Sequence, residues 1–310
     1  MRTDADRTDS YRPRRALLGG AASLVTVFIL IGAKTFAFWQ SGSASVYASL
    51  MDSLADVTAS GMSLLAIHLS LKPADKNHRS GHGKIEGLAA LFQALLILGA
   101  GISLFIEAAR RMAEPAPVEH VGLATVIMAF SVALSVALVA VQKWALRSAP
   151  SLALEADQAH YSMDILVNAG VIAVLFLMTA GAPPWIDPAF AVCVALYLAH
   201  TAYAIARKGL DMLLDRELPK TTREAIRSVV LAQDGVLGMH DLRTSQSGMR
   251  IFISFDIEAD PNLPLIQAHA IARGVEHALL SAFPNAEIMI HVDPSGDTDD
   301  ARHRPAAARP

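Results

Sequence analysis

Four ionisable residues of this sequence lie inside long apolar segments. Asp52 and Asp56 are four residues apart in one segment, and His160 and Asp164 are four residues apart in another. Residues at i and i+4 share one face of a helix, so each pair would present two ligand groups together. One imidazole with three carboxylates suits a tetrahedral divalent metal such as zinc or cadmium better than magnesium or calcium. Protons bind the same groups, so a metal ion and protons would compete for such a site.

These residues would be costly in the apolar interior of a membrane. At about 2.5–3.5 kcal/mol each, three Asp residues at mid-membrane disfavour insertion by roughly 8–10 kcal/mol. A chain that keeps them there is expected to use them, and a site between the two segments would explain all four together. The competing interpretation is that they only cap, kink or pair helices within a bundle.

A second group of possible metal ligands lies in the polar stretch 72–84. Asp75, His78 and His82 fall close together there, beside Gly81 and Gly83. A loop with this composition could clamp a metal ion, and a solvated polar loop is the alternative interpretation.

A third group lies near the C-terminus, where apolar and polar residues alternate as in strands. His291 and Asp293 would share one strand face, opposite the apolar residues of that strand. Asp256 likewise lies opposite the apolar residues of an earlier strand. His240 and His269 are further candidates, but spacing alone does not bring them together, and ordinary surface histidines are the alternative.

Composition places the chain among membrane proteins. Its 310 residues are 53% hydrophobic and only 18% charged, and the mean hydropathy is +0.38. A net charge of -3 without a dominant basic patch argues against a nucleic-acid partner. The single cysteine, Cys193, excludes an internal disulfide and a Cys-based zinc site.

Six apolar segments predict six transmembrane helices within residues 16–214, because runs of roughly 20–28 residues can cross a bilayer of about 30 Å. Their approximate ranges are 16–39, 44–71, 85–112, 121–146, 151–180 and 188–214. Lys34 interrupts the first segment near its far end, where a long side chain can extend to the membrane surface. The polar, Arg-rich residues 1–15 predict a disordered tail.

The distribution of Lys and Arg predicts the orientation. These residues gather in the N-terminal tail, in the stretch 72–84 and after the fourth and sixth spans, whereas the opposite loops have none. The positive-inside rule then places both termini in the cytoplasm. Each ionisable pair lies roughly 8–13 residues from the start of its helix, so both pairs fall near mid-membrane.

Residues 215–294 predict a small soluble domain. A helix capped by Thr221 or Thr222 and ending near Gln233 comes first. The later elements predicted are strands 236–246 and 250–259, an amphipathic helix 264–283 and a strand 287–292. The order αββαβ suits an α+β sandwich, and residues 295–310 predict a disordered tail.

Over about residues 15–294 the sequence resembles the cation diffusion facilitator family, in particular its bacterial zinc transporters. The motifs that carry the resemblance occur in order: Met51-Asp-Ser-Leu-Ala-Asp56, Lys72-Pro-Ala-Asp-Lys-Asn-His-Arg-Ser-Gly-His-Gly-Lys84, His160-Tyr-Ser-Met-Asp164, Leu214-Asp-Arg-Glu-Leu-Pro219, His240-Asp-Leu-Arg-Thr-Ser-Gln-Ser-Gly248, Leu263-Pro-Leu-Ile-Gln-Ala-His269 and Ile290-His-Val-Asp-Pro294. The resemblance implies a homodimeric divalent-metal/proton antiporter of the bacterial inner membrane, with six helices and a ferredoxin-like cytoplasmic domain.

The resemblance also assigns metal sites. The ligands it implies are Asp52, Asp56, His160 and Asp164 for the transport site, Asp75, His78 and His82 for the loop site, and His240, Asp256, His269, His291 and Asp293 for a paired-metal site of the cytoplasmic domain. Lys84 and Asp215 align with an ion pair that interlocks the dimer. The sequence departs from those transporters at Asp256, where they have His, and at Val292, where they have Gln. Since Asp can still bind a metal, Asp256 is expected to change the metal affinity of the site rather than to abolish the site.

The function predicted is therefore transport and not enzymatic catalysis. The cargo would be Zn²⁺, with Cd²⁺ or Fe²⁺ as further candidates, exchanged for protons across the lipid bilayer. The alternative is a membrane metal sensor that signals through its cytoplasmic domain. An intramembrane metallohydrolase would need a positioned Glu such as that of His-Glu-x-x-His, which this sequence lacks.

Overall fold

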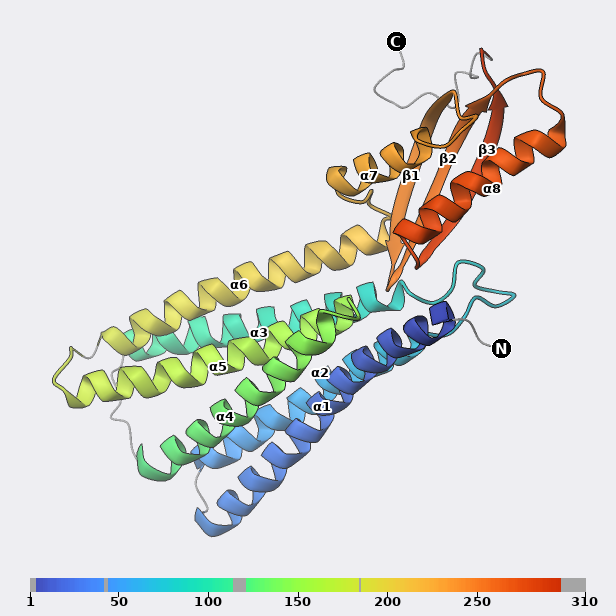
Figure 1. Cartoon of the computed structure of the whole chain (residues 1–310). Helices are drawn as coiled ribbons and strands as arrows, with labels where there is room; N and C mark the ends of the chain where they lie inside the picture. Colours follow the sequence, from blue (N-terminus) through green and yellow to red (C-terminus); the bar gives the residue numbers. More distant parts are fainter. Residues whose placement is uncertain (1–3, 42–43, 114–120, 184, 297–310) are drawn as a thin grey trace. The chain divides into compact units, whose positions relative to one another are not determined.

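The chain divides into two compact units, Met1–Leu210 and Asp211–Pro310. The structure, a computed structural model, describes residues 4–41, 44–113, 121–183 and 185–296. In the described part of the chain, long helices build the first unit, and a three-stranded sheet with two helices builds the second (Figure 1). Nearly all of the tail predicted for residues 295–310 lies outside the described residues.

The first unit is a bundle of helices that correspond to the six predicted spans. These helices are α1 (Asp4–Ser41), α2 (Ala44–Ser70), α3 (Ile85–Ala113), α4 (Val121–Leu146), α5 (Leu152–Thr179) and α6 (Ile186–Leu213). Polar, Gly- and Pro-containing stretches separate the apolar runs and end the helices. Helix α1 begins at Asp4, so it includes most of the segment predicted to be a tail.

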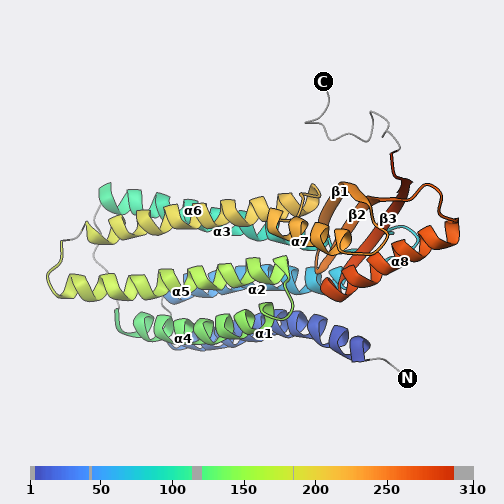
Figure 2. The same ribbon diagram turned by 45° about the horizontal axis from the view of Figure 1, so that its top comes forward.

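Helices α2 and α5, which carry the ionisable pairs, lie in the middle of the bundle. The pair α1 and α4 lies on one side of them and the pair α3 and α6 on the other (Figure 2). Small and branched side chains pack α5 against α3 and α6: Ala90, Ala94, Ile97, Ala156, Met163, Val194 and Leu198 are buried together. The outer pairs therefore flank the two helices that carry the ionisable pairs.

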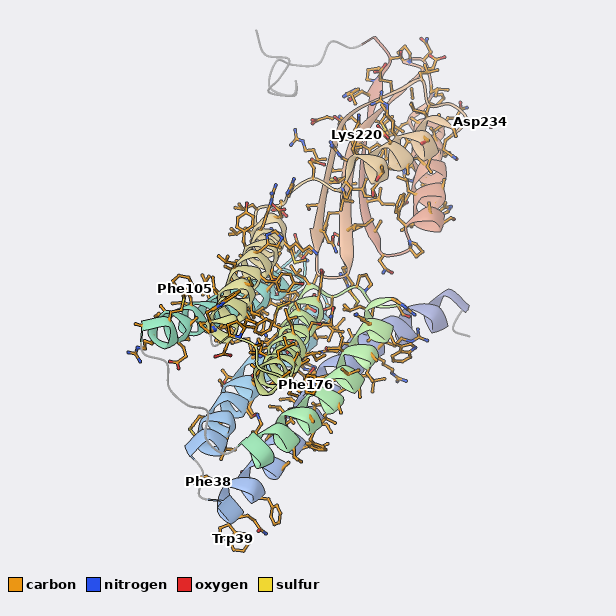
Figure 3. The ribbon with its side chains drawn as sticks, turned by 90° about the vertical axis from the view of Figure 1, so that its left-hand side faces the viewer. Phe38, Trp39, Phe105, Phe176, Lys220 and Asp234 are labelled. Atoms are coloured by element: carbon orange, nitrogen blue, oxygen red, sulfur yellow. The ribbon has the colours of Figure 1, made fainter. Side chains whose placement is uncertain are left out.

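The bundle surface is apolar, as a lipid-facing surface must be. The side chains of Trp39, Phe105 and Phe176 are exposed on it (Figure 3). Among the described residues, four helical segments are long and apolar enough to cross a membrane by length and composition: Arg14–Gln40, Ile85–Arg110, Ala129–Leu146 and Ile186–Leu213. Helices α2 and α5 are not among these four segments, and they are the two that hold the ionisable pairs.

The second unit contains α7 (Lys220–Leu231), β1 (Gly238–Ser247), β2 (Arg250–Ala259), α8 (Leu265–Ala282) and β3 (Ala286–Pro294). Strand β1 pairs antiparallel with β2, and β2 pairs parallel with β3 through the crossover helix α8. The predicted order αββαβ is thus confirmed. The predicted Thr cap of α7 is wrong, because Pro219 is the N-cap residue and its carbonyl accepts the backbone N–H groups of Thr222 and Arg223. Figure 3 labels Lys220, at the start of α7, and Asp234, in the turn that follows it.

One face of the sheet holds the core of this unit. Ile253, Phe255 and Ile257 of β2 are almost completely buried against α7 and α8. Successive side chains of a strand point to opposite faces. Asp256 and Glu258 therefore lie on the other face of the sheet, opposite this core.

Candidate metal centres

The first candidate centre lies between α2 and α5. The His160 Nε2 atom is 3.0 Å from Asp56 Oδ1 and 3.7 Å from Asp164 Oδ2. One ligand atom from each of these residues lies within 4.8 Å of the other two, which is close enough for one metal ion. Asp56 and His160 come from different helices, so helix packing as well as the i, i+4 spacing builds the group.

Asp52 lies on α2, one turn before Asp56. Its side chain is outside the described part of the structure, so its place in this centre stays a prediction. The helix position nevertheless puts Asp52 on the face of α2 that carries Asp56.

A buried carboxylate, Asp157, lies one helical turn before His160 on α5. Asp157 is completely buried, and Ser23 Oγ (2.6 Å), Gln142 Nε2 (2.8 Å) and Ser60 Oγ (3.2 Å) donate hydrogen bonds to it. The Ser60 hydroxyl is also 2.9 Å from the Tyr161 hydroxyl. These residues come from α1, α2, α4 and α5, so one polar network connects four helices beside the predicted metal ligands.

Glu86 is a second buried carboxylate that connects helices, at the end of the bundle where α5 begins. Its carboxylate accepts hydrogen bonds from Ser151 Oγ (2.8 Å) and the Leu152 backbone N–H (2.7 Å), and from Ser70 Oγ (2.7 Å) of α2. A carboxylate at a helix N-terminus satisfies otherwise unpaired N–H groups and interacts favourably with the helix dipole. Glu86 thus fixes the start of the helix that carries His160. Neither Asp157 nor Glu86 was among the predicted site residues, although each is an acidic residue within or beside an apolar segment.

The second candidate centre is the loop between α2 and α3. The Asp75 carboxylate is 3.5 Å from His78 Nδ1 and 3.4 Å from His82 Nε2. The backbone N–H groups of His78 and Asn77 donate to Asp75 and hold the pKa of its carboxyl below the ordinary value. Gly81 takes a positive φ of 77°, which lets the loop turn back on itself. The structure therefore brings together all three predicted loop ligands.

A further observation makes the loop suitable for a metal ion. The Nδ1 atom of His82 is buried and has no hydrogen-bond partner among the described residues. Two imidazoles and one carboxylate are a donor set that zinc accepts. In such a site Asp75, His78 and His82 would supply three ligands.

The third candidate centre is a row of side chains across the sheet. The register pairs His240 of β1 with Asp256 of β2, and Asp256 with His291 of β3. His240 Nδ1 is 3.7 Å from Asp256 Oδ2, and His240 Nε2 is 3.6 Å from Asp293 Oδ2. His291 Nε2 is in turn 2.9 Å from Asp293 Oδ1. Four predicted ligands therefore lie together on the sheet face away from the core.

Two residues change the predicted composition of this third centre. His269 lies on α8 and, among the described residues, is outside the close group formed by His240, Asp256 and Asp293. Glu258 was not predicted, but its Oε1 atom is 4.0 Å from His240 Nε2. Glu258 is two residues after Asp256 on the same strand, and that spacing was the signal available in the sequence.

Asp256 is the ligand candidate at which this centre differs from the zinc transporters that the sequence resembles. Partial burial raises the pKa of its carboxyl, and the nearby His240 lowers it again in part. A carboxylate is a harder ligand than an imidazole, so the donor set is less selective for zinc over manganese than one with His at this position. Asp256→His is expected to raise the zinc-to-manganese affinity ratio of the purified chain by roughly tenfold. Titration with each metal checks this, with the exposed Asp260→His as control. An unchanged zinc-to-manganese affinity ratio would mean that Asp256 is not a metal ligand.

The predicted ion pair of Lys84 and Asp215 joins residues of the two units. Lys84 precedes α3 in the first unit, and Asp215 follows α6 in the second, with a positive φ of 54°. The pairing of the two residues stays a prediction.

Comparison with known proteins relates both units to one family. Residues 21–214 match the cation efflux transmembrane domain, and residues 218–295 match the cytoplasmic domain of cation efflux proteins. The chain is 40% identical over 277 residues to the cation-efflux pump FieF of Klebsiella pneumoniae, covering 89% of this chain and 91% of the relative. It is 42% identical over 277 residues to FieF of Shewanella oneidensis, covering 89% and 93%.

Solved structures of shorter chains are also similar. The metal-bound C-terminal domain of the CzcD transporter from Thermotoga maritima is 26% identical, with a TM-score of 0.25, and the match covers 26% of this chain and 100% of that one. The Zn form of CzrB is 33% identical, with a TM-score of 0.26, over 28% of this chain and 99% of that one. The family matches and the relatives at about 40% identity carry the assignment. This chain belongs to the cation efflux, or cation diffusion facilitator, family: it is a multi-pass helical membrane protein of a family of metal-cation efflux transporters.

Proposed function

We propose that this protein is a divalent-metal/proton antiporter that exports Zn²⁺ from the cytoplasm across the bacterial inner membrane. The observation that carries the proposal is the group Asp56, His160 and Asp164, which lies between the two central helices of the membrane domain. With Asp52 it supplies four ligands, the number that zinc prefers. The presence of an imidazole favours zinc or cadmium, with iron next, over ions that prefer a shell of oxygen ligands alone.

The chemistry of this centre supports an exchange of metal for protons. Carboxylates in the bundle interior are poorly solvated, so they need a positive partner. A divalent cation provides one, and protons on the carboxylates and the imidazole provide another. The two occupants exclude each other, so a change of access from one side of the membrane to the other would couple outward metal movement to inward proton movement.

The other two centres support roles in supply and regulation. The loop centre follows α2, in the stretch 72–84 that is rich in Lys and Arg, and we infer that this end of α2 and both termini are cytoplasmic. There, Asp75, His78 and His82 would hold a metal ion near the entrance. In the second unit His240, Asp256, His291 and Asp293 would hold a metal ion that stabilises a homodimer, with Lys84 and Asp215 as the interlocking ion pair.

A flux experiment tests the proposal. Full-length protein is reconstituted into sealed vesicles, and zinc uptake is measured with and without an imposed pH gradient. Gradient-dependent uptake is expected for the intact chain, and its loss is expected for the double variant His160→Ala with Asp164→Ala, because two of the four ligands are then missing.

The control is His200→Ala, which removes an exposed His of α6 and should leave uptake unchanged. Zinc uptake that ignores the pH gradient would contradict antiport. Uptake that survives in the double variant would contradict the site. Zinc binding without any flux would instead favour the sensor function.

A further inference from the structure

Lys34 is a buried cation in a helix that crosses the membrane. Its side chain is only 6% exposed, and its Nζ atom donates a hydrogen bond of 2.6 Å to Ser53 Oγ of α2. A Lys near the end of a span normally extends to the membrane surface, as was predicted for Lys34 from its position in the sequence. The structure instead turns the ammonium group into the bundle, toward α2.

Ser53 places this ammonium group beside the transport site. Ser53 directly follows Asp52 and precedes Asp56 by three residues, and it is completely buried. Residues at i and i+3 of a helix are neighbours on one face, with about 5–6 Å between their Cβ atoms. The hydrogen bond therefore holds the Lys34 charge on the part of α2 that carries the Asp ligands.

The charges of the site explain why a cation belongs there. Asp52, Asp56 and Asp164 carry three negative charges when ionised, and a divalent cation neutralises two of them. The remaining charge would be unbalanced in a poorly solvated bundle, where charges without a partner are strongly disfavoured. The ammonium group of Lys34 supplies one positive charge, which balances the three ligand carboxylates and the divalent cation.

We infer that Lys34 is a fixed counter-charge of the transport site, a positioning residue that adapts three carboxylates to a divalent cation and limits how tightly that cation binds. The inference rests on the proposed function, because it takes the four ligands as the metal site. It adds a residue from α1 to a centre otherwise built on α2 and α5. The positive charge repels the bound metal, so the site binds the metal strongly enough to load but weakly enough to release it.

Neutral variants of Lys34 test the inference through binding rather than transport. The full-length chain first receives Asp75→Ala, His82→Ala, His240→Ala and Asp293→Ala, so that the intramembrane site dominates zinc binding. Zinc affinity is then measured by competition with a fluorescent chelator at mildly alkaline pH, where protons compete least. Lys34→Gln is expected to lower the Kd by about tenfold or more, since a charge hydrogen-bonded to Ser53 repels the metal ion in a medium of effective dielectric near 20.

Three further variants separate charge from structure. Lys34→Arg keeps the charge and should keep the Kd of the parent chain. Lys34→Met removes the charge without leaving an unpaired polar group, and it should tighten binding as Lys34→Gln does. Ser53→Ala removes the hydrogen bond but keeps the charge, and it should change the Kd far less than either neutral variant.

Each other outcome has a definite meaning. An unchanged or weaker affinity in a folded neutral variant would overturn the inference. Folding of Lys34→Arg with failure of both neutral variants to fold would assign Lys34 to stability and would also overturn it. If Asp56→Ala in the same background leaves zinc affinity unchanged, the proposed function fails instead, because the four ligands are then not the site.

Discussion

Asp56→Ala is expected to reduce the initial rate of zinc transport by more than about 100-fold. Asp56 is the α2 residue whose carboxylate contacts His160 of α5, at 3.0 Å, so its removal takes away one proposed ligand and the contact that orients another. Loss of a group that only orients a metal ligand already reduces metal affinity or activity by about 10- to 100-fold. Zinc uptake into vesicles at a fixed pH gradient measures the effect.

Glu155→Ala is the matched control for this variant. Glu155 is a carboxylate in the first turn of α5, but it is partly exposed and pairs with Lys208. Exposed ion pairs contribute little, about 0–1 kcal/mol, so transport should stay within about twofold of the intact rate. Similar rates for Asp56→Ala and Glu155→Ala would show that the centre between α2 and α5 does not carry the metal.

Asp157→Ala is expected to lower the free energy of unfolding by about 2–4 kcal/mol, because it removes the acceptor that buried donors on three helices share. Ser23, Ser60 and Gln142 all donate to the Asp157 carboxylate. An unmade hydrogen bond of a buried group costs about 1–3 kcal/mol, although hydrogen bonds between membrane helices average nearer 0.6 kcal/mol. Thermal unfolding of the metal-free, detergent-purified chain measures the loss.

Two smaller changes at the same network serve as comparisons. Asp157→Asn keeps one acceptor oxygen and the shape of the side chain, so it should lose less than half as much stability. Ser23→Ala removes a single donor and should cost about 1 kcal/mol or less. An unfolding temperature for Asp157→Ala equal to that of the intact chain would mean that the network does not hold the four helices together.

Hydropathy and alternation predicted the elements of this fold because both signals are local. Each membrane helix must bury a continuous apolar run, and β2 must alternate because one face packs on a core, so their ranges follow from the residues themselves. The start of α7 at Lys220 was missed because the N-cap residue is Pro219, which makes no side-chain cap hydrogen bond. The Thr-cap rule therefore placed the start too late in the sequence.

The contacts between helices beside the candidate metal centre depend on how the helices pack, and the spacing of residues along the sequence does not determine that packing. Equal depth suggested that α2 and α5 could meet, but only the structure shows Asp56 against His160. The partners of Asp157 are uncharged Ser and Gln residues, which look ordinary in any helix. Lys34 can reach either the membrane surface or the bundle interior with the same side chain, so its sequence position left the direction open.

The polar network of Asp157 has a consequence for the empty protein. In small zinc-binding domains the metal supplies the folding free energy, and its removal unfolds the chain. Here the oxygens of Asp157 receive their hydrogen bonds from the chain itself, so four helices hold together without help from the cargo. A carrier must release its ion in every cycle and survive until the next one arrives. A bundle that is stable without the ion meets this requirement. The stability of the bundle then does not depend on the affinity for the transported metal.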